Sequence, residues 1–141
     1  MYKYISNSEK ETINLGKKFA KQLKRNDIVV LTGNLGAGKT KFVQGILEFF
    51  GLEKEISSPT FTIVNEYDAK HFSIYHFDIY RLNNIDEFYE MGGDEYFTKD
   101  GVCIIEWGES LEPILKGNYY KISILPVENQ EDSRTILIDK F

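Results

Sequence analysis

The segment at residues 33–40, Gly-Asn-Leu-Gly-Ala-Gly-Lys-Thr, constrains the fold of this 141-residue chain more than any other. An apolar run at residues 27–32 precedes it, and an amphipathic run at residues 39–50 follows it. The segment fits the spacing G-x-x-x-x-G-K-[ST]. Glycines let the backbone turn back and direct successive N–H groups at one point, where a following helix adds the positive end of its dipole. The pattern therefore predicts a phosphate-binding loop between a buried strand and a helix.

The side chains at the end of this segment predict how a nucleotide triphosphate and its metal would be held. We expect Lys39 to reach the β- and γ-phosphates and Thr40 to give its hydroxyl to Mg²⁺. Nucleotide contacts are expected from the whole loop and the first residues of the helix: Gly33, Asn34, Leu35, Gly36, Ala37, Gly38, Lys39, Thr40 and Lys41. ATP and Mg²⁺ are therefore the predicted ligands.

The remaining hydrophobic patterns predict one α/β domain over residues 1–141. Apolar alternation and turn residues indicate a hairpin between the first βα unit and a second buried strand, and an antiparallel pair at the end of the chain. The order of elements predicts a P-loop NTPase-like fold with a mixed parallel and antiparallel sheet flanked by helices. We expect strands near 2–5, 26–33, 101–108, 119–127 and 133–139, a hairpin turning near 68–70, and helices near 9–24, 39–51, 84–92 and from 110.

Charge and composition limit the classes of function. The net charge is −5, and the densest basic stretch, residues 17–25, is interpreted as a solvated helix face. A protein that grips nucleic acid alone usually presents a basic face, so direct binding of nucleic acid is not expected. With a single cysteine, no apolar run of about 20 residues and no signal-peptide profile at the N-terminus, the chain is expected to be cytoplasmic and to have no membrane contact.

Two acidic residues at strand positions are candidates for the metal carboxylate that hydrolysis needs. Glu106 follows an apolar run typical of a central parallel strand, so its carboxylate is expected at the ligand-binding edge of the sheet, as a metal ligand beside Thr40. Asp78 shares one strand face with His76 and is surrounded by apolar sequence, so it needs a partner or a metal. A catalytic role for Asp78 and a structural one, such as a pair with Arg81, are equally favoured.

Other polar residues carry weaker indications. Thr60, in the Ser-Ser-Pro-Thr segment after the P-loop helix, is placed to close over the γ-phosphate, although a simple turn entering a strand is an equal alternative. We expect His76 to be satisfied by hydrogen bonds, Trp107 to lie in the core or an interface, and Cys103 to be an inert core residue.

Motifs that the sequence lacks limit the nucleotide and the reaction that we expect. The sequence has no N-K-x-D motif for guanine, which leaves adenine as the expected base, and no lid-like insertion that would favour a kinase. A small kinase and a nucleotide-gated binding module with negligible turnover remain alternatives to an ATP hydrolase.

Four blocks in order, LTGNLGAGKT, SSPTF, HFDIYRL and IIEWGE, resemble the bacterial TsaE family, formerly YjeE. The resemblance covers nearly the whole chain. It implies a P-loop ATPase that works with TsaD and TsaB to make threonylcarbamoyladenosine beside the tRNA anticodon, with tRNA bound only indirectly through the complex. It also implies that Lys39, Thr60, Asp78 and Glu106 are catalytic and that Thr40 and Glu106 serve the metal.

Overall fold

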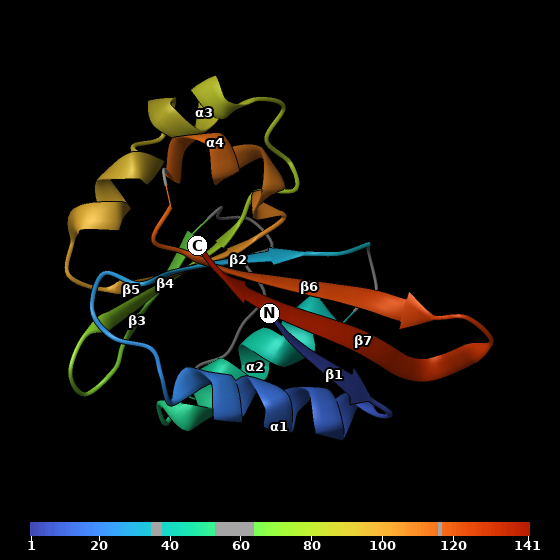
Figure 1. Cartoon of the computed structure of the whole chain (residues 1–141). Helices are drawn as coiled ribbons and strands as arrows, with labels where there is room; N and C mark the ends of the chain where they lie inside the picture. The colour runs from blue at the N-terminus through green and yellow to red at the C-terminus, as the bar shows by residue number, and fades with distance from the viewer. Residues whose placement is uncertain (35–37, 53–63, 116) are drawn as a thin grey trace.

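The computed structural model describes residues 1–34, 38–52, 64–115 and 117–141. Within these residues the strands form one seven-stranded sheet of order β1-β7-β6-β2-β5-β4-β3. Figure 1 shows α1 and α2 on one side of the sheet and α3 and α4 on the other. The strands are β1 (Tyr2–Ser6), β2 (Ile28–Thr32), β3 (Val64–Asp68), β4 (Ser73–Asp78), β5 (Val102–Glu106), β6 (Tyr120–Val127) and β7 (Gln130–Lys140). The helices are α1 (Glu9–Ala20), α2 (Lys39–Phe49), α3 (Ile85–Glu90) and α4 (Glu112–Leu115), with 3₁₀ helices η1 (Gly93–Thr98) and η2 (Gly108–Leu111).

The centre of the sheet is parallel and its margins are antiparallel. β2 runs parallel to both β5 and β6, and β4 runs parallel to β5. β1 with β7, β6 with β7, and β3 with β4 form antiparallel pairs. The predicted mixed α/β sheet is therefore confirmed. Because β2, β4 and β5 are parallel, their carboxyl ends meet at one edge, where Glu106 pairs with both Leu31 and Asp78.

α1 and α2 cross closely because glycine lies on each helix at the crossing. A methyl group at Gly16 would overlap the carbonyl oxygen of Phe42, and one at Gly45 would overlap that of Ile13. This close approach presses the apolar side of α2 onto the sheet, where Phe42 and Ile46 are fully buried. The helix that begins at the glycine-rich loop is thus fixed on two sides.

Two element boundaries differ from the sequence prediction. α1 ends at Ala20, not near residue 24, because the chain tightens into turns and the Lys24 N–H donates to Asp27 Oδ2 at 2.8 Å. β7 begins at Gln130, before its predicted start, because the polar residues there extend the hairpin beyond the rest of the sheet (Figure 1). Among the described helices, none has the length and apolar character needed to cross a membrane.

Candidate functional site

The glycine-rich loop leaves the end of β2 at the carboxyl edge of the parallel strands. Gly33 and Gly38 have φ angles of 144° and 105°, a region that favours glycine, and Gly38 caps the start of α2. The Phe42 N–H donates to the Gly38 carbonyl at 3.1 Å, which closes the first helical turn. The strand, loop and helix order predicted for the phosphate loop is thus present at residues 28–34 and 38–49. Leu35, Gly36, Ala37 and Thr60 lie outside the described residues.

Lys39 is buried at the start of α2, with 4% of its surface exposed. Its ammonium donates to the Gly33 carbonyl at 2.5 Å and to the Asn34 carbonyl at 3.0 Å. The same Nζ lies 3.7 Å from the centre of the Trp107 ring, a cation–π contact. Trp107 adopts a left-handed backbone conformation with φ of 63°, so it leaves the end of β5 at a sharp angle. The lysine is therefore held between its own loop and the residue that follows β5.

The charges around Lys39 are acidic. Burial lowers the pKa of the Lys39 ammonium, and the negative charges of Glu106, Glu109 and Asp78 oppose that shift. Glu109 was not among the site residues predicted from the sequence, because it lies on η2 in an exposed polar segment that matches no motif. One buried ammonium thus faces three carboxylates at this edge of the sheet.

Glu106 is a buried carboxylate at the end of β5, with His76 and Thr40 as polar neighbours. It is 5% exposed, and the Thr40 hydroxyl lies 3.5 Å from its Oε1 atom, a long hydrogen bond. His76 Nε2 lies 2.6 Å from the other carboxylate oxygen, Oε2. The structure therefore brings Lys39, Thr40 and Glu106 to one place, as the sequence predicts, although their roles stay predictions. The hydrogen bond expected for His76 is present, but its partner was not foreseen.

Asp78 and Lys41 lie at the margin of this group. Asp78 is the pairing neighbour of Glu106 across β4 and β5, and its Oδ1 accepts the Tyr80 N–H at 3.1 Å. That bond supports a structural contribution from Asp78 and leaves its catalytic role a prediction. The Lys41 ammonium lies 3.8 Å from a Glu9 carboxylate oxygen on α1, so its side chain is directed away from Lys39.

The donor set fits a cation that needs few protein ligands. The described residues contain no cluster of three or more His, Cys, Asp or Glu side chains arranged to hold a metal. Mg²⁺ usually keeps several waters and takes one or two protein oxygens together with substrate phosphates. The Thr40 hydroxyl at the start of α2 and the Glu106 carboxylate at the end of β5 lie close together and fit that requirement.

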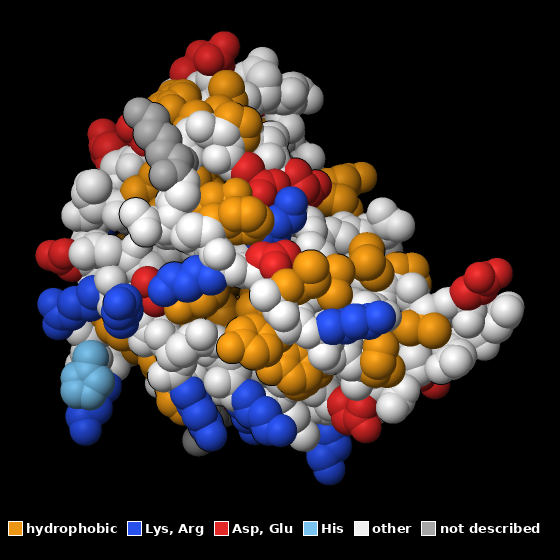
Figure 2. Space-filling model, in the orientation of Figure 1, with side chains coloured by type: hydrophobic (Ala, Val, Ile, Leu, Met, Phe, Trp, Pro, Cys, Tyr) orange, Lys and Arg blue, Asp and Glu red, His pale blue; other side chains and the backbone are white. Residues whose placement is uncertain are grey.

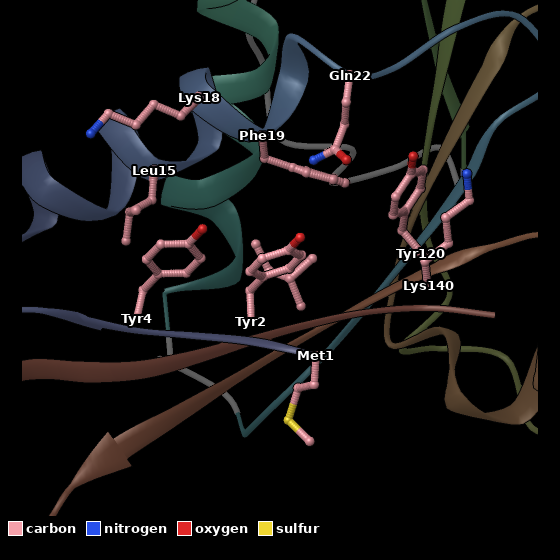
Figure 3. Close-up of a pocket in the computed structure, with 10 residues that line it drawn as sticks. Met1, Tyr2, Tyr4, Leu15, Lys18, Phe19, Gln22, Tyr120 and Lys140 are labelled. Carbon is pink, nitrogen blue, oxygen red and sulfur yellow. The ribbon is translucent and has the colours of Figure 1, made fainter.

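A separate cavity of about 500 Å³ lies between α1 and the outer strands. Figure 3 shows Tyr2, Tyr4 and Leu15 converging on it from β1 and α1. Tyr120, also in its lining, pairs with Val29 near the start of β2, so the cavity lies toward the opposite end of the sheet from Lys39. It contains no residue of the predicted site.

The basic residues of α1 lie on the surface beside this cavity. Figure 2 shows blue side chains along the side of the molecule that carries α1. On α1, the Lys17 side chain is 46% exposed, and its ammonium lies 3.3 Å from Glu48 on α2. The basic residues of the 17–25 stretch are exposed, as the interpretation as a solvated face expects, but only residues 17–20 of that stretch lie on the helix.

Comparison with known proteins identifies the family. The family model described as "Threonylcarbamoyl adenosine biosynthesis protein TsaE" matches residues 6–136. The chain is 40% identical over 136 residues to the tRNA threonylcarbamoyladenosine biosynthesis protein TsaE of Rickettsia typhi, covering 96% of this chain and 94% of the relative. It is 39% identical over 122 residues to the Bacillus subtilis protein of the same name, covering 86% of this chain and 76% of the relative.

A solved structure agrees with these sequence relatives. The crystal structure of YdiB from Bacillus subtilis superposes with a TM-score of 0.79 at 34% identity, covering 99% of this chain and 84% of that one. The resemblance carried by the four sequence blocks is therefore confirmed across the whole fold. The chain belongs to the TsaE family of tRNA threonylcarbamoyladenosine biosynthesis proteins.

Proposed function

We propose that this chain is a magnesium-dependent ATP hydrolase that acts in complex with TsaD and TsaB to support threonylcarbamoyladenosine formation in tRNA. The observation that carries the proposal is the convergence of Lys39, Thr40 and Glu106 where the glycine-rich loop joins β2 to α2. Family membership supports the pathway, and this convergence supports the chemistry.

Lys39 is suited to neutralise phosphate charge. An ammonium has three N–H donors, and two of them rest on the carbonyls of Gly33 and Asn34. The third donor is available to a phosphate oxygen in the loop, and burial makes such a charge-assisted bond stronger than it would be in water. The Trp107 ring beneath Nζ limits where the ammonium can move.

Thr40 and Glu106 are the residues that would hold the metal. Bound Mg²⁺ would supply positive charge to the phosphates as negative charge develops on the leaving group. Asp78, next to Glu106 across the two strands, is the nearest further carboxylate able to orient a water molecule. Its Oδ1 accepts the Tyr80 N–H, so Oδ2 is the oxygen that we assign to that task.

The carboxylates around Lys39 support the proposal that the isolated chain hydrolyses ATP slowly. Three carboxylates face one ammonium, so the site repels a triphosphate unless a metal or another cation balances them. Arg25 donates to the His71 carbonyl and Arg134 to the carbonyls of Glu131 and Ser133, so these two guanidinium groups are engaged elsewhere. We therefore infer that TsaD or TsaB raises the rate by supplying positive charge or by ordering the site.

The experiment that tests this function measures phosphate release from ATP against Mg²⁺ concentration for the wild type, Glu106→Gln and Asp78→Asn. Each change keeps shape and removes one charge. Both variants should hydrolyse ATP more slowly, and Glu106→Gln should need more Mg²⁺ because Glu106 lies beside Thr40. Glu109→Gln is the matched control, since it removes a charge near Lys39 from an exposed position.

The same assay distinguishes the alternatives. Phosphate release that requires an added metabolite would indicate a kinase, and nucleotide binding without release even beside the partners would indicate a binding module. Equal Mg²⁺ dependence in the wild type and Glu106→Gln would refute the assignment of the metal carboxylate.

A further inference from the structure

His76 is a buried polar residue to which the proposed function assigns no role. It lies on β4 and is 4% exposed. Strand pairing places Ile104, not Glu106, opposite His76, so its ring reaches two residues along β5 to the end of the strand. There Nε2 meets Glu106 Oε2 at 2.6 Å, a short contact between two buried groups.

The hydrogen-bond pattern assigns the proton of the imidazole ring. A carboxylate only accepts hydrogen bonds, so a bond this short to Glu106 requires the proton on Nε2. The described residues offer Nδ1 no partner. Nε2 is thus the ring nitrogen through which His76 is anchored, and its N–H donates to the Glu106 carboxylate.

Each oxygen of the Glu106 carboxylate lies beside a different donor. His76 takes Oε2, while the Thr40 hydroxyl lies beside Oε1. A glutamate side chain has several rotatable bonds, and it presents an oxygen in a fixed direction only when another group holds it. Asp78, the direct pairing neighbour, cannot do so as an anion, because two carboxylates repel each other.

We propose that His76 is a positioning residue for the metal site: it holds Glu106 by Oε2 so that Oε1 faces Thr40 and a divalent cation. This inference rests on the proposed function, because it concerns the same metal site. In this role His76 acts through Glu106 and is not itself a metal ligand. Outer partners of metal-ligating side chains typically contribute about 10- to 100-fold to metal affinity.

Two variants separate the hydrogen bond from the space that the ring fills. His76→Gln places an amide N–H near the position of Nε2 and can still donate to Glu106. His76→Asn has an amide that ends near the position of Nδ1 and falls short of Glu106. Both substitutions are polar and uncharged, so they differ mainly in reach. Tyr75→Phe, on the opposite face of the same strand, controls for a general disturbance of β4.

The experiment titrates Mn²⁺ into an equimolar mixture of protein and ADP and measures free Mn²⁺ by electron paramagnetic resonance. A titration of ADP alone provides the baseline. ADP affinity in EDTA and the melting temperature are measured for each variant. We expect His76→Asn to bind Mn²⁺ about 10- to 100-fold more weakly, with unchanged ADP affinity in EDTA. His76→Gln should stay within about threefold of the wild type, as should Tyr75→Phe.

Three outcomes would overturn the inference. Wild-type Mn²⁺ affinity in His76→Asn would show that the bond does not position Glu106. Equal losses in His76→Asn and His76→Gln, in proportion to their melting temperatures, would show a purely structural role. A wild-type protein that binds ADP with no added affinity for Mn²⁺ would refute the metal site itself, and with it the proposed function.

Discussion

Replacing Lys39 with methionine tests whether this buried ammonium serves ligand binding or folding. Methionine keeps most of the buried stem and removes the charge. The ammonium makes two charge-assisted hydrogen bonds to loop carbonyls and one contact with Trp107, together worth about 3.5–8 kcal/mol. Burying a charge costs several kcal/mol, and burial lowers the Lys39 pKa despite three nearby carboxylates, so desolvation outweighs their attraction.

These opposing terms predict a variant that folds normally and binds nucleotide poorly. We expect the free energy of unfolding to change by less than about 1 kcal/mol, because the lost contacts and the relieved desolvation nearly cancel. One lost charge-assisted bond to phosphate, about 1.5–3 kcal/mol, corresponds to ADP or ATP affinity weaker by about 10- to 150-fold. ATP hydrolysis should be abolished.

The assays are urea unfolding and nucleotide titration at the same pH and ionic strength. Lys18→Met is the matched control, since Lys18 is an exposed lysine on α1 and its loss changes the net charge equally. A Lys39→Met protein with wild-type nucleotide affinity would refute the phosphate site. A loss of more than about 2 kcal/mol in stability would show that the ammonium mainly stabilises its own loop.

Two further predictions concern packing and ionisation. Gly45→Ala should destabilise the protein by about 1–3 kcal/mol in urea unfolding, because the added methyl group meets the Ile13 carbonyl. Gly51→Ala is the control: its methyl group meets no atom, so it should cost only about 1 kcal/mol of left-handed backbone strain. Equal losses of stability in the two variants would contradict the close crossing of α1 and α2. Burial raises the pKa of the Cys103 thiol from 9.0 to about 12, so the folded form keeps a proton that the unfolded form releases above pH 9, and stability falls as the pH rises through that range. Between pH 8 and pH 10.5 this difference in pKa lowers the free energy of unfolding of the wild type by about 2 kcal/mol, a decrease that Cys103→Ala should not show. The same pH dependence of stability in the wild type and Cys103→Ala would show that folding does not protect the thiol.

The sequence contains most of the fold because its strongest signals are local. The apolar runs of β2 and β5 are buried on both faces, as expected for central parallel strands. Ser8 is the N-cap of α1 and accepts the Glu11 N–H at 3.1 Å, an arrangement typical of a serine followed three residues later by glutamate. Local chemistry predicts where this helix starts, and the turns that follow Ala20 set where it ends.

The parts that could not be predicted depend on contacts between distant segments. η1 shows no helical periodicity, and its Tyr96 ring packs against Phe77 of β4 at 5.3 Å between ring centres. The bond from His76 to Glu106 requires β4 to lie beside β5 in one register, which a single sequence does not specify. The candidate metal carboxylate was predictable from its place at a strand end, whereas the residue that holds it was not.

We propose that ATP binding and hydrolysis at the Lys39–Glu106 site are coupled to the partner proteins. The most direct test measures the affinity of the chain for TsaB–TsaD with ADP and with a non-hydrolysable ATP analogue, and phosphate release with and without the partners. Because linkage is reciprocal, we expect the two affinities to differ by at least about fivefold, and the partners to raise the rate. Identical affinities together with an unstimulated rate would contradict the account.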